Sequence, residues 1–136
     1  EDICNDMSIK AKKYSIDIMT NIEEGFIIGQ ENKMKQLIIN LLDNAIKYSF
    51  SEESININAF NEDKTYTIEI SNKSNPIPCD IYNSIFEPFV KGNNTIEAGS
   101  SGLGLYICSE IVKEHNGQIF IKNGNEVKVT VKIPSL

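Results

Sequence analysis

The apolar residues of this 136-residue chain recur with two different periods, and each period predicts one kind of element. Between about residues 30 and 49 they are spaced by three and four, which predicts an amphipathic helix. The apolar stripe of this helix consists of Met34, Leu37, Ile38, Leu41, Leu42, Ala45 and Ile46. The same spacing predicts a helix over residues 103–115, with Asn116 and Gly117 as its stop, and a short helix over residues 3–13.

Alternating apolar and polar residues predict five strands, over residues 15–22, 54–58, 65–70, 118–122 and 126–133. FNEDK and NGN read as hairpin connections, and SNKSNPIP (residues 71–78) has the composition of a turn. Helices and strands do not alternate regularly. We therefore expect residues 1–136 to form one α+β domain, an α/β sandwich. Its sheet would be mixed and mostly antiparallel, with about five strands and about three helices on one face.

Bulk composition excludes several classes of function. A net charge of −6 argues against a nucleic-acid-binding protein, which needs a basic surface. Cys4, Cys79 and Cys108 lie far apart and fit free thiols in a reducing compartment. His115 is the single histidine and cannot build a His-rich metal site. No apolar run approaches the roughly 20 residues that a membrane span needs. The chain does not begin with methionine, so we expect it to be a piece of a longer protein.

A polar stripe runs beside the apolar one on the helix predicted at residues 30–49. Gln36, Asn40, Asn44 and Lys47 follow one another at spacings of four, four and three. Asparagine is a poor residue for a helix interior, so two of them suggest a task other than helix stability. An amide oxygen can ligate magnesium, and a nearby lysine can meet phosphates. The alternative is an ordinary solvated face.

A glycine-rich segment, GSSGLGL (residues 99–105), opens directly into the helix predicted at residues 103–115. Glycines allow a ligand to approach the backbone closely, and the free amides at a helix N-terminus favour a phosphate. The segment lacks the Gly-Lys-Ser/Thr of a P-loop. A flexible loop before a glycine-rich helix start is the alternative.

Taken together, three ordered segments resemble the catalytic, ATP-binding domain of sensor histidine kinases, in the superfamily shared with gyrase, a heat-shock chaperone and a mismatch-repair ATPase. NLLDNAIKYS (40–49) resembles the asparagine box and IFEPFVKG (85–92) the phenylalanine box. GSSGLGLYICSEIVKEHNG (99–117) is similar to the second glycine box. The match covers about residues 30–122. The resemblance implies a sandwich in which ATP lies between the long helix and a mobile lid.

Residue by residue, the resemblance implies that Asn44 binds magnesium and that Lys47 meets a phosphate, the two catalytic positions. The lid would comprise residues 92–101. Phe86 and Phe89 would either anchor a loop to the core or take part in lid movement, while His115 would be structural. The implied nucleotide-binding residues are Asn40, Tyr48, Asn72, Ile77, Lys91, Gly102, Leu103, Gly104 and Leu105.

The resemblance also implies a divided reaction. Hydrolysing relatives carry a glutamate where this chain has Asn40, and an amide cannot act as a general base. The domain would therefore hold Mg-ATP until a histidine on a separate dimerisation domain of the same protein accepts the γ-phosphate. A downstream response regulator would follow. We expect a cytoplasmic domain of a protein attached to the membrane. The alternatives are an interaction module that has lost nucleotide binding and a serine kinase of the anti-sigma type.

One segment departs from the family pattern. The first glycine box reads roughly Asp-x-Gly-x-Gly-Ile-Pro, and this chain has Asn72, Ser74 and Pro76 at the aspartate and glycine positions, followed by Ile77 and Pro78. In the family the aspartate accepts a hydrogen bond from the adenine amine, and charge-assisted hydrogen bonds are about twice as strong as neutral ones. We therefore expect ATP to bind more weakly by about 1–2 kcal/mol. An asparagine could also turn its donor toward the carbonyl of guanine.

Overall fold

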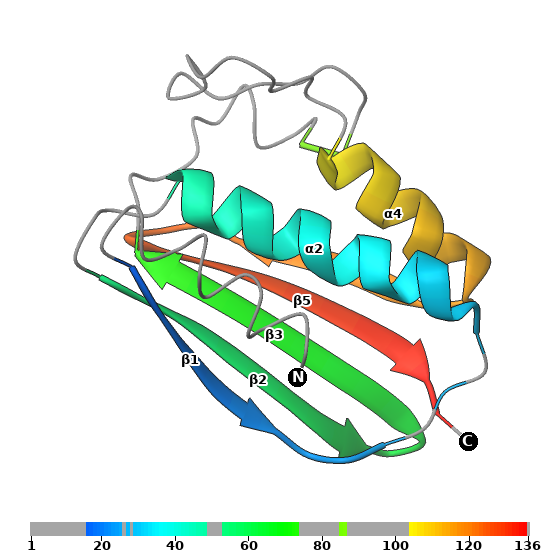
Figure 1. Cartoon of the computed structure of the whole chain (residues 1–136). Coiled ribbons are helices and arrows are strands. Elements are labelled where there is room, and N and C mark those ends of the chain that lie inside the picture. The colour runs from blue at the N-terminus through cyan, green and yellow to red at the C-terminus, as the bar shows by residue number, and fades with distance from the viewer. Residues whose placement is uncertain are drawn as a thin grey trace.

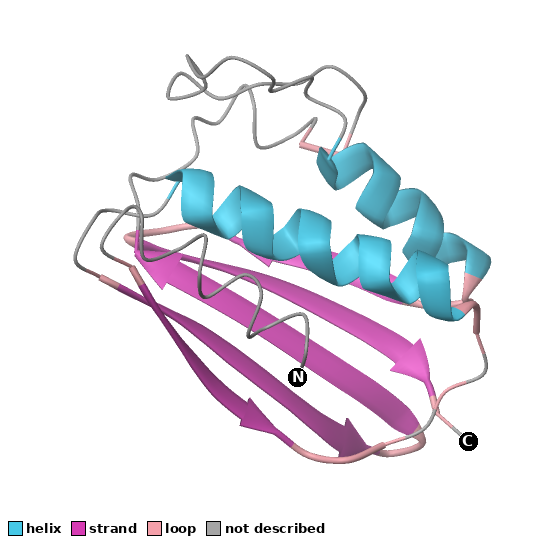
Figure 2. Cartoon of the chain, viewed as in Figure 1, coloured by secondary structure: helices cyan, strands magenta, loops and turns pink. Residues whose placement is uncertain are grey.

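A computed structural model describes residues 16–25, 27, 29–48, 53–73, 85–86 and 104–135 of the chain, with the side chain of Tyr48 excluded. Along the sequence, the elements are β1 (Asp17–Ile22), α2 (Glu31–Tyr48), β2 (Ser54–Glu62), β3 (Thr65–Lys73), α4 (Gly104–Glu114), β4 (Gln118–Lys122) and β5 (Glu126–Pro134). The two helices lie side by side over one face of a single sheet (Figures 1 and 2).

The sheet has five strands in the order β1-β2-β3-β5-β4, so β3 is its central strand. β1 runs parallel to β2, and the other three neighbouring pairs are antiparallel. The predicted α/β sandwich with a mixed, mostly antiparallel sheet is therefore confirmed. Both predicted helices in the described part of the chain are present, and the third, at residues 3–13, lies outside the described residues.

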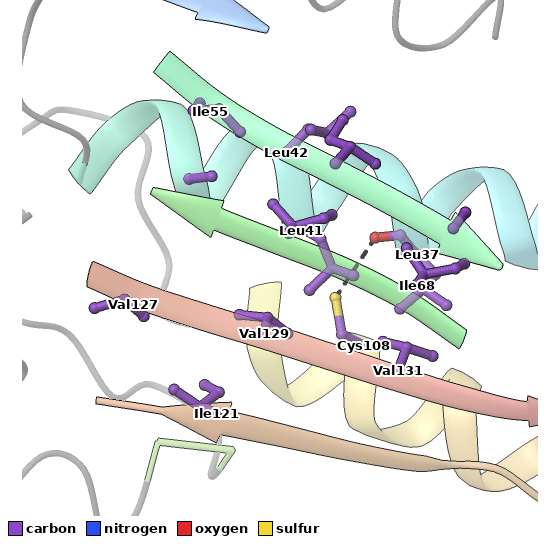
Figure 3. Close-up of a cluster of buried hydrophobic side chains, with 14 of the residues drawn as sticks. Leu37, Leu41, Leu42, Ile55, Ile68, Cys108, Ile121, Val127, Val129 and Val131 are labelled. Carbon is purple, nitrogen blue, oxygen red and sulfur yellow. Dashed lines mark hydrogen bonds between the residues drawn. The ribbon is translucent and has the colours of Figure 1, made fainter. Parts of the chain in front are cut away.

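The hydrophobic core lies between the helices and the sheet. The apolar stripe of α2 contributes Leu37 and Leu42, which are fully buried, and β2 and β5 contribute Ile55 and Val131 in the same state. Removal of such side chains from water is the main favourable term in folding, at about 1.5–3 kcal/mol each. Cys108 of α4 is also fully buried, and its Sγ donates to the backbone oxygen of Leu37 at 3.8 Å (Figure 3).

The C-terminus of α4 ends in a left-handed residue, as the sequence predicted. Asn116 has a φ of 60°. The Gly117 N–H donates to the Val112 oxygen at 2.9 Å and the Asn116 N–H to the Lys113 oxygen at 3.0 Å. These two bonds define a Schellman motif, which satisfies carbonyls that a helix end would otherwise leave free.

The hairpin of β2 and β3 is longer than its alternating pattern indicated. β3 continues through Ser71, Asn72 and Lys73, which the composition of SNKSNPIP had assigned to a turn; that part of the prediction is wrong. The extension forms because β5 supplies a partner for each residue, with Asn72 opposite Val127 and Lys73 opposite Glu126. Backbone pairing with a neighbouring strand thus outweighs the local turn preference. Residues 74–78 lie outside the described residues.

Candidate functional site

The polar stripe of α2 lies on the side of that helix that faces α4. Leu37 marks this side, because its carbonyl oxygen accepts the hydrogen bond from Cys108 of α4 (Figure 3). Asn40 and Asn44 follow Leu37 by three and seven residues, a spacing that places them on the same side of the helix. Both asparagines are half-buried. The two residues predicted to meet a nucleotide and its metal therefore lie toward the side of α2 that faces α4, and neither is fully exposed to solvent.

Asn40 contains a buried donor without a partner. Its Nδ2 has no hydrogen-bond partner among the described residues. Leaving such a group unsatisfied costs about 1–3 kcal/mol, so native proteins rarely retain one without a reason. An acceptor on a bound ligand would recover that cost. This observation does not fit the alternative of an ordinary solvated face.

Lys47, at the end of the stripe, forms an ion pair within α2. Its Nζ lies 3.3 Å from Oδ2 of Asp43, and the two side chains are 28% and 26% exposed. An acidic residue four positions before a lysine is the favourable orientation for such a pair on a helix. The pair keeps the ammonium group on the helix beside Asn44. Sequence reasoning did not assign a role to Asp43, although the i,i+4 spacing was a readable signal.

Asn72 is the second residue with an orphaned buried amide. It is 6% exposed, and its Nδ2 has no hydrogen-bond partner among the described residues. Alternation along β3 places it on the same face as Ile68 and Ile70, which belong to the core beneath the helices. β3 and α2 both end at the same side of the molecule (Figure 1). Asn72 therefore lies on the helix-facing side of the central strand, near the end that carries Asn44 and Lys47.

The N-terminus of α4 begins at Gly104. This residue is exposed, and a Cβ built on it would meet no atom within 4 Å. Among the described residues, nothing therefore requires glycine at this position. No acidic side chain occupies the first turn, so no carboxylate within this turn neutralises the positive end of the helix dipole, which attracts anions. Leu105 is half-buried against the core. Two residues after Gly104, a side-chain hydrogen bond with Glu110 and the charge of that carboxylate raise the pKa of Tyr106.

The remaining predicted site residues lie outside the described part of the chain. These are the Tyr48 side chain, Ile77, Lys91, Gly102 and Leu103, together with Phe89 and the lid at residues 92–101. Phe86 is described and packs half-buried against the core, in agreement with the anchoring role.

His115 is held by both ring nitrogens. Nδ1 lies 2.7 Å from the Ile111 oxygen, and Nε2 lies 3.2 Å from the Gln30 backbone nitrogen. The carbonyl can only accept and the amide can only donate, so the imidazole is neutral, with its proton on Nδ1. The side chain is buried, with 8% exposed. This arrangement is structural, as the sequence analysis expected.

Among the described residues, no group of three or more His, Cys, Asp or Glu side chains could hold a metal ion. Neither α2 nor α4, the helices of the described part, is long and apolar enough to cross a bilayer.

Comparison with known proteins points to one family. Residues 29–136 match the family described as histidine kinase-, DNA gyrase B-, and HSP90-like ATPase. The signal transduction histidine-protein kinase BaeS of Escherichia coli is 34% identical over 79% of this chain and 24% of its own length. The heme sensor protein HssS of Staphylococcus haemolyticus is 32% identical over 93% of this chain and 29% of its own length. The chain thus spans about a quarter to a third of these relatives.

Solved structures agree with this comparison. The catalytic domain of the histidine kinase ThkA has a TM-score of 0.81 and 27% identity, and the match covers 98% of this chain and 91% of that one. The mycobacterial sensor histidine kinase MprB has a TM-score of 0.85 over 98% of this chain and 94% of that one. At 19% identity, MprB shows the fold alone.

Proposed function

The chain belongs to the histidine kinase-, DNA gyrase B-, and HSP90-like ATPase family, with sensor histidine kinases among its relatives, and from this premise we propose its reaction. It binds Mg-ATP and donates the γ-phosphate to a histidine on a separate dimerisation domain, as one step of two-component signal transduction. Residues 1–136 act as the single ATP-binding catalytic domain of a longer protein. A downstream response regulator receives the phosphate. The domain lies in the cytoplasm, and the full-length protein is attached to the membrane.

The orphaned amide of Asn40 is the observation that carries this proposal. A buried donor on the α4 side of α2 has no partner among the described residues, and a nucleotide provides many acceptor oxygens and nitrogens. The α4 N-terminus adds free backbone donors on a second element, without an opposing carboxylate in its first turn. The described residues therefore fit a phosphorylated ligand between the two helices.

The donor set also fits magnesium. Asn44 would hold the ion through its Oδ1, with Asn40 on the same side of the helix and phosphate oxygens completing the shell. Magnesium is suited to such a site, because it prefers oxygen ligands and keeps several waters. When bound, the ion would neutralise charge that develops on the phosphoryl group.

Lys47 would contribute a second positive charge. Its pairing with Asp43 at 3.3 Å limits the positions that the ammonium group visits before ligand arrives. Since the pair is partly exposed, Asp43 holds the lysine only modestly, at a typical strength of about 0.3–0.5 kcal/mol. A phosphate can therefore attract the ammonium group at little cost, because only a weak ion pair with Asp43 has to break.

The domain is built to hold ATP rather than to hydrolyse it. The side chain at position 40 is an amide, which cannot take a proton from water at neutral pH. His115 cannot serve as the acceptor, because it is buried and both its ring nitrogens form hydrogen bonds. A histidine from another domain would thus supply the nucleophile, and the residues of this chain would position and neutralise the phosphates.

The test is phosphotransfer by the full-length protein that carries this chain. We expect incubation with Mg-ATP to produce acid-labile phosphate on a histidine outside residues 1–136, and Asn44→Ala to abolish it. Asn32→Ala is the matched control: the same substitution on the same helix, at an exposed position in its first turn, twelve residues before Asn44. Acid-stable phosphate on serine would instead support the anti-sigma type of kinase. Folded protein that binds no Mg-ATP would support an interaction module.

A further inference from the structure

Two of the buried polar atoms without a partner in the described part of the chain belong to β3, on residues five positions apart and therefore on opposite faces of the strand. These atoms are Oγ1 of Thr67 and Nδ2 of Asn72. Thr67 faces away from the helices, opposite Phe60 and Lys132. Asn72 faces the helices, opposite Val127. Only Asn72 therefore lies on the side of the sheet where the proposed function places a ligand.

The surroundings of Asn72 select the part of a nucleotide that could reach it. Its neighbours on this face are Ile70 along β3 and Val127 on β5, both apolar and buried. A charged phosphate would lose its hydration there and gain only a neutral amide in return. A planar, uncharged base loses less and offers hydrogen-bonding groups along its edge. The phosphates instead match Lys47 and the N-terminus of α4, which carry positive charge or dipole.

The chemistry of an amide then determines which bases fit. Asparagine has both a donor, Nδ2, and an acceptor, Oδ1, and a half-turn about its last side-chain torsion exchanges them. In one orientation, Oδ1 accepts from the amine and Nδ2 donates to N1 of a 6-aminopurine. In the other orientation, Nδ2 donates to O6 and Oδ1 accepts from N1–H of a 6-oxopurine. A carboxylate could not form the second pair of hydrogen bonds, because it has no donor for O6 and would place a negatively charged oxygen against it.

We propose that Asn72 reads the base of the bound nucleotide and admits 6-oxopurine nucleoside triphosphates as well as ATP. This inference rests on the proposed nucleotide-binding function and names its substrate class. The orphaned Nδ2 is a donor that either N1 of a 6-aminopurine or O6 of a 6-oxopurine would satisfy. Asn72 is thus a specificity-determining residue, and the chain is a kinase domain of relaxed purine choice.

The experiment measures the dissociation constants of ATP, ITP and GTP for the chain, with magnesium, by calorimetry. ITP carries O6 and N1–H but lacks the 2-amino group of GTP, so it tests the carbonyl alone. We expect ITP to bind within about tenfold of ATP, a difference of about 1.4 kcal/mol or less. Asn72→Asp should raise the ITP-to-ATP ratio of dissociation constants by about tenfold or more, because the site then rejects O6.

Thr67→Val is the matched control, since it removes the orphaned hydroxyl of the same strand on the opposite face. It should leave the ITP-to-ATP ratio unchanged. ITP that fails to bind where ATP saturates the chain would overturn the inference and leave the proposed function standing. If neither nucleotide binds to the folded chain, the proposed function fails and the inference falls with it. The comparison of nucleotides on the unmodified chain requires no variant to fold.

Discussion

The Gln30 backbone N–H donates a hydrogen bond of 3.2 Å to Nε2 of His115, across 85 residues of sequence. The other ring nitrogen is bonded to the Ile111 oxygen at 2.7 Å. The single histidine of the chain therefore ties the start of α2 to the end of α4. Because the proposed site lies between these two helices, the bond helps to fix the frame on which the ligand-binding residues are arranged.

Replacing His115 should destabilise the domain without removing its chemistry. We expect His115→Ala to lower the free energy of unfolding by about 2–3 kcal/mol, because it empties a buried position and leaves the Gln30 amide without its partner. Urea denaturation measures this loss. Phosphotransfer per folded molecule should persist, and its complete absence in folded protein would contradict the structural role.

Gly29 tests the same contact from the other side. A Cβ at this position would lie 2.4 Å from Cδ2 and 2.6 Å from Nε2 of His115, well inside van der Waals contact. Gly29→Ala should therefore destabilise the domain, and the double variant Gly29→Ala/His115→Ala should lose less than the sum of the two. Additive losses would show that the ring and the glycine do not constrain each other.

The variant Gly104→Ala tests whether glycine at this position serves ligand binding rather than folding. Because no atom of the described residues lies within 4 Å of a Cβ there, Gly104→Ala should fold and gain up to about 1 kcal/mol of stability from its better helix propensity. If phosphates approach the backbone at this helix start, the same variant should weaken Mg-ATP binding in calorimetry. An unchanged dissociation constant, with stability raised, would remove Gly104 from the site.

We expect this chain to bind ATP more weakly than typical members of its family do. Asn72 supplies a neutral hydrogen bond where the family has a charged acceptor, which weakens binding by about 1–2 kcal/mol. Calorimetry with magnesium and a non-hydrolysable ATP analogue measures it. Binding in the low-micromolar range would contradict the prediction. Asn72→Asp provides the internal comparison and should bind the ATP analogue more tightly than the unmodified chain.

Alkaline pH should destabilise the domain through Cys108. Burial raises the pKa of this thiol to about 12, whereas an unfolded cysteine has a pKa of about 8.5. The folded state thus keeps a proton that the unfolded state releases. The contribution is fully present below about pH 8.5 and is lost as pH rises toward 12, at up to about 1.4 kcal/mol per unit. Burial, followed by the charge of Glu23, raises the pKa of Tyr66 and acts in the same direction above about pH 10.

Unfolding free energies measured in urea between pH 8 and 10 test this slope. Cys108→Ala should be less stable at pH 8, because it leaves a cavity in the core, yet it should lose less stability as pH rises. Parallel pH profiles for the two proteins would show that the buried thiol does not control the alkaline decline.

Much of the fold follows from local patterns. The period of Leu37, Leu41 and Ala45 predicts α2, and the alternation along residues 126–133 predicts β5, because each element must bury one face. The Asn116–Gly117 stop of α4 was also readable, since asparagine tolerates a left-handed conformation. The end of β3 was not, because Ser71, Asn72 and Lys73 become a strand only when β5 lies beside them.

The chemical groups that the site could use follow from the order of residue types along the chain. They are the two asparagines and the lysine of α2, and the glycines at the start of α4. Their types and spacing are local properties, and they also carry the family pattern. Which of the described polar groups lack hydrogen-bond partners, by contrast, becomes apparent only in the folded chain. Whether an amide such as that of Asn40 or Asn72 is satisfied depends on atoms from elements far away in sequence. Burial removes the water that would otherwise satisfy it, and so turns an ordinary polar residue into one that requires a ligand.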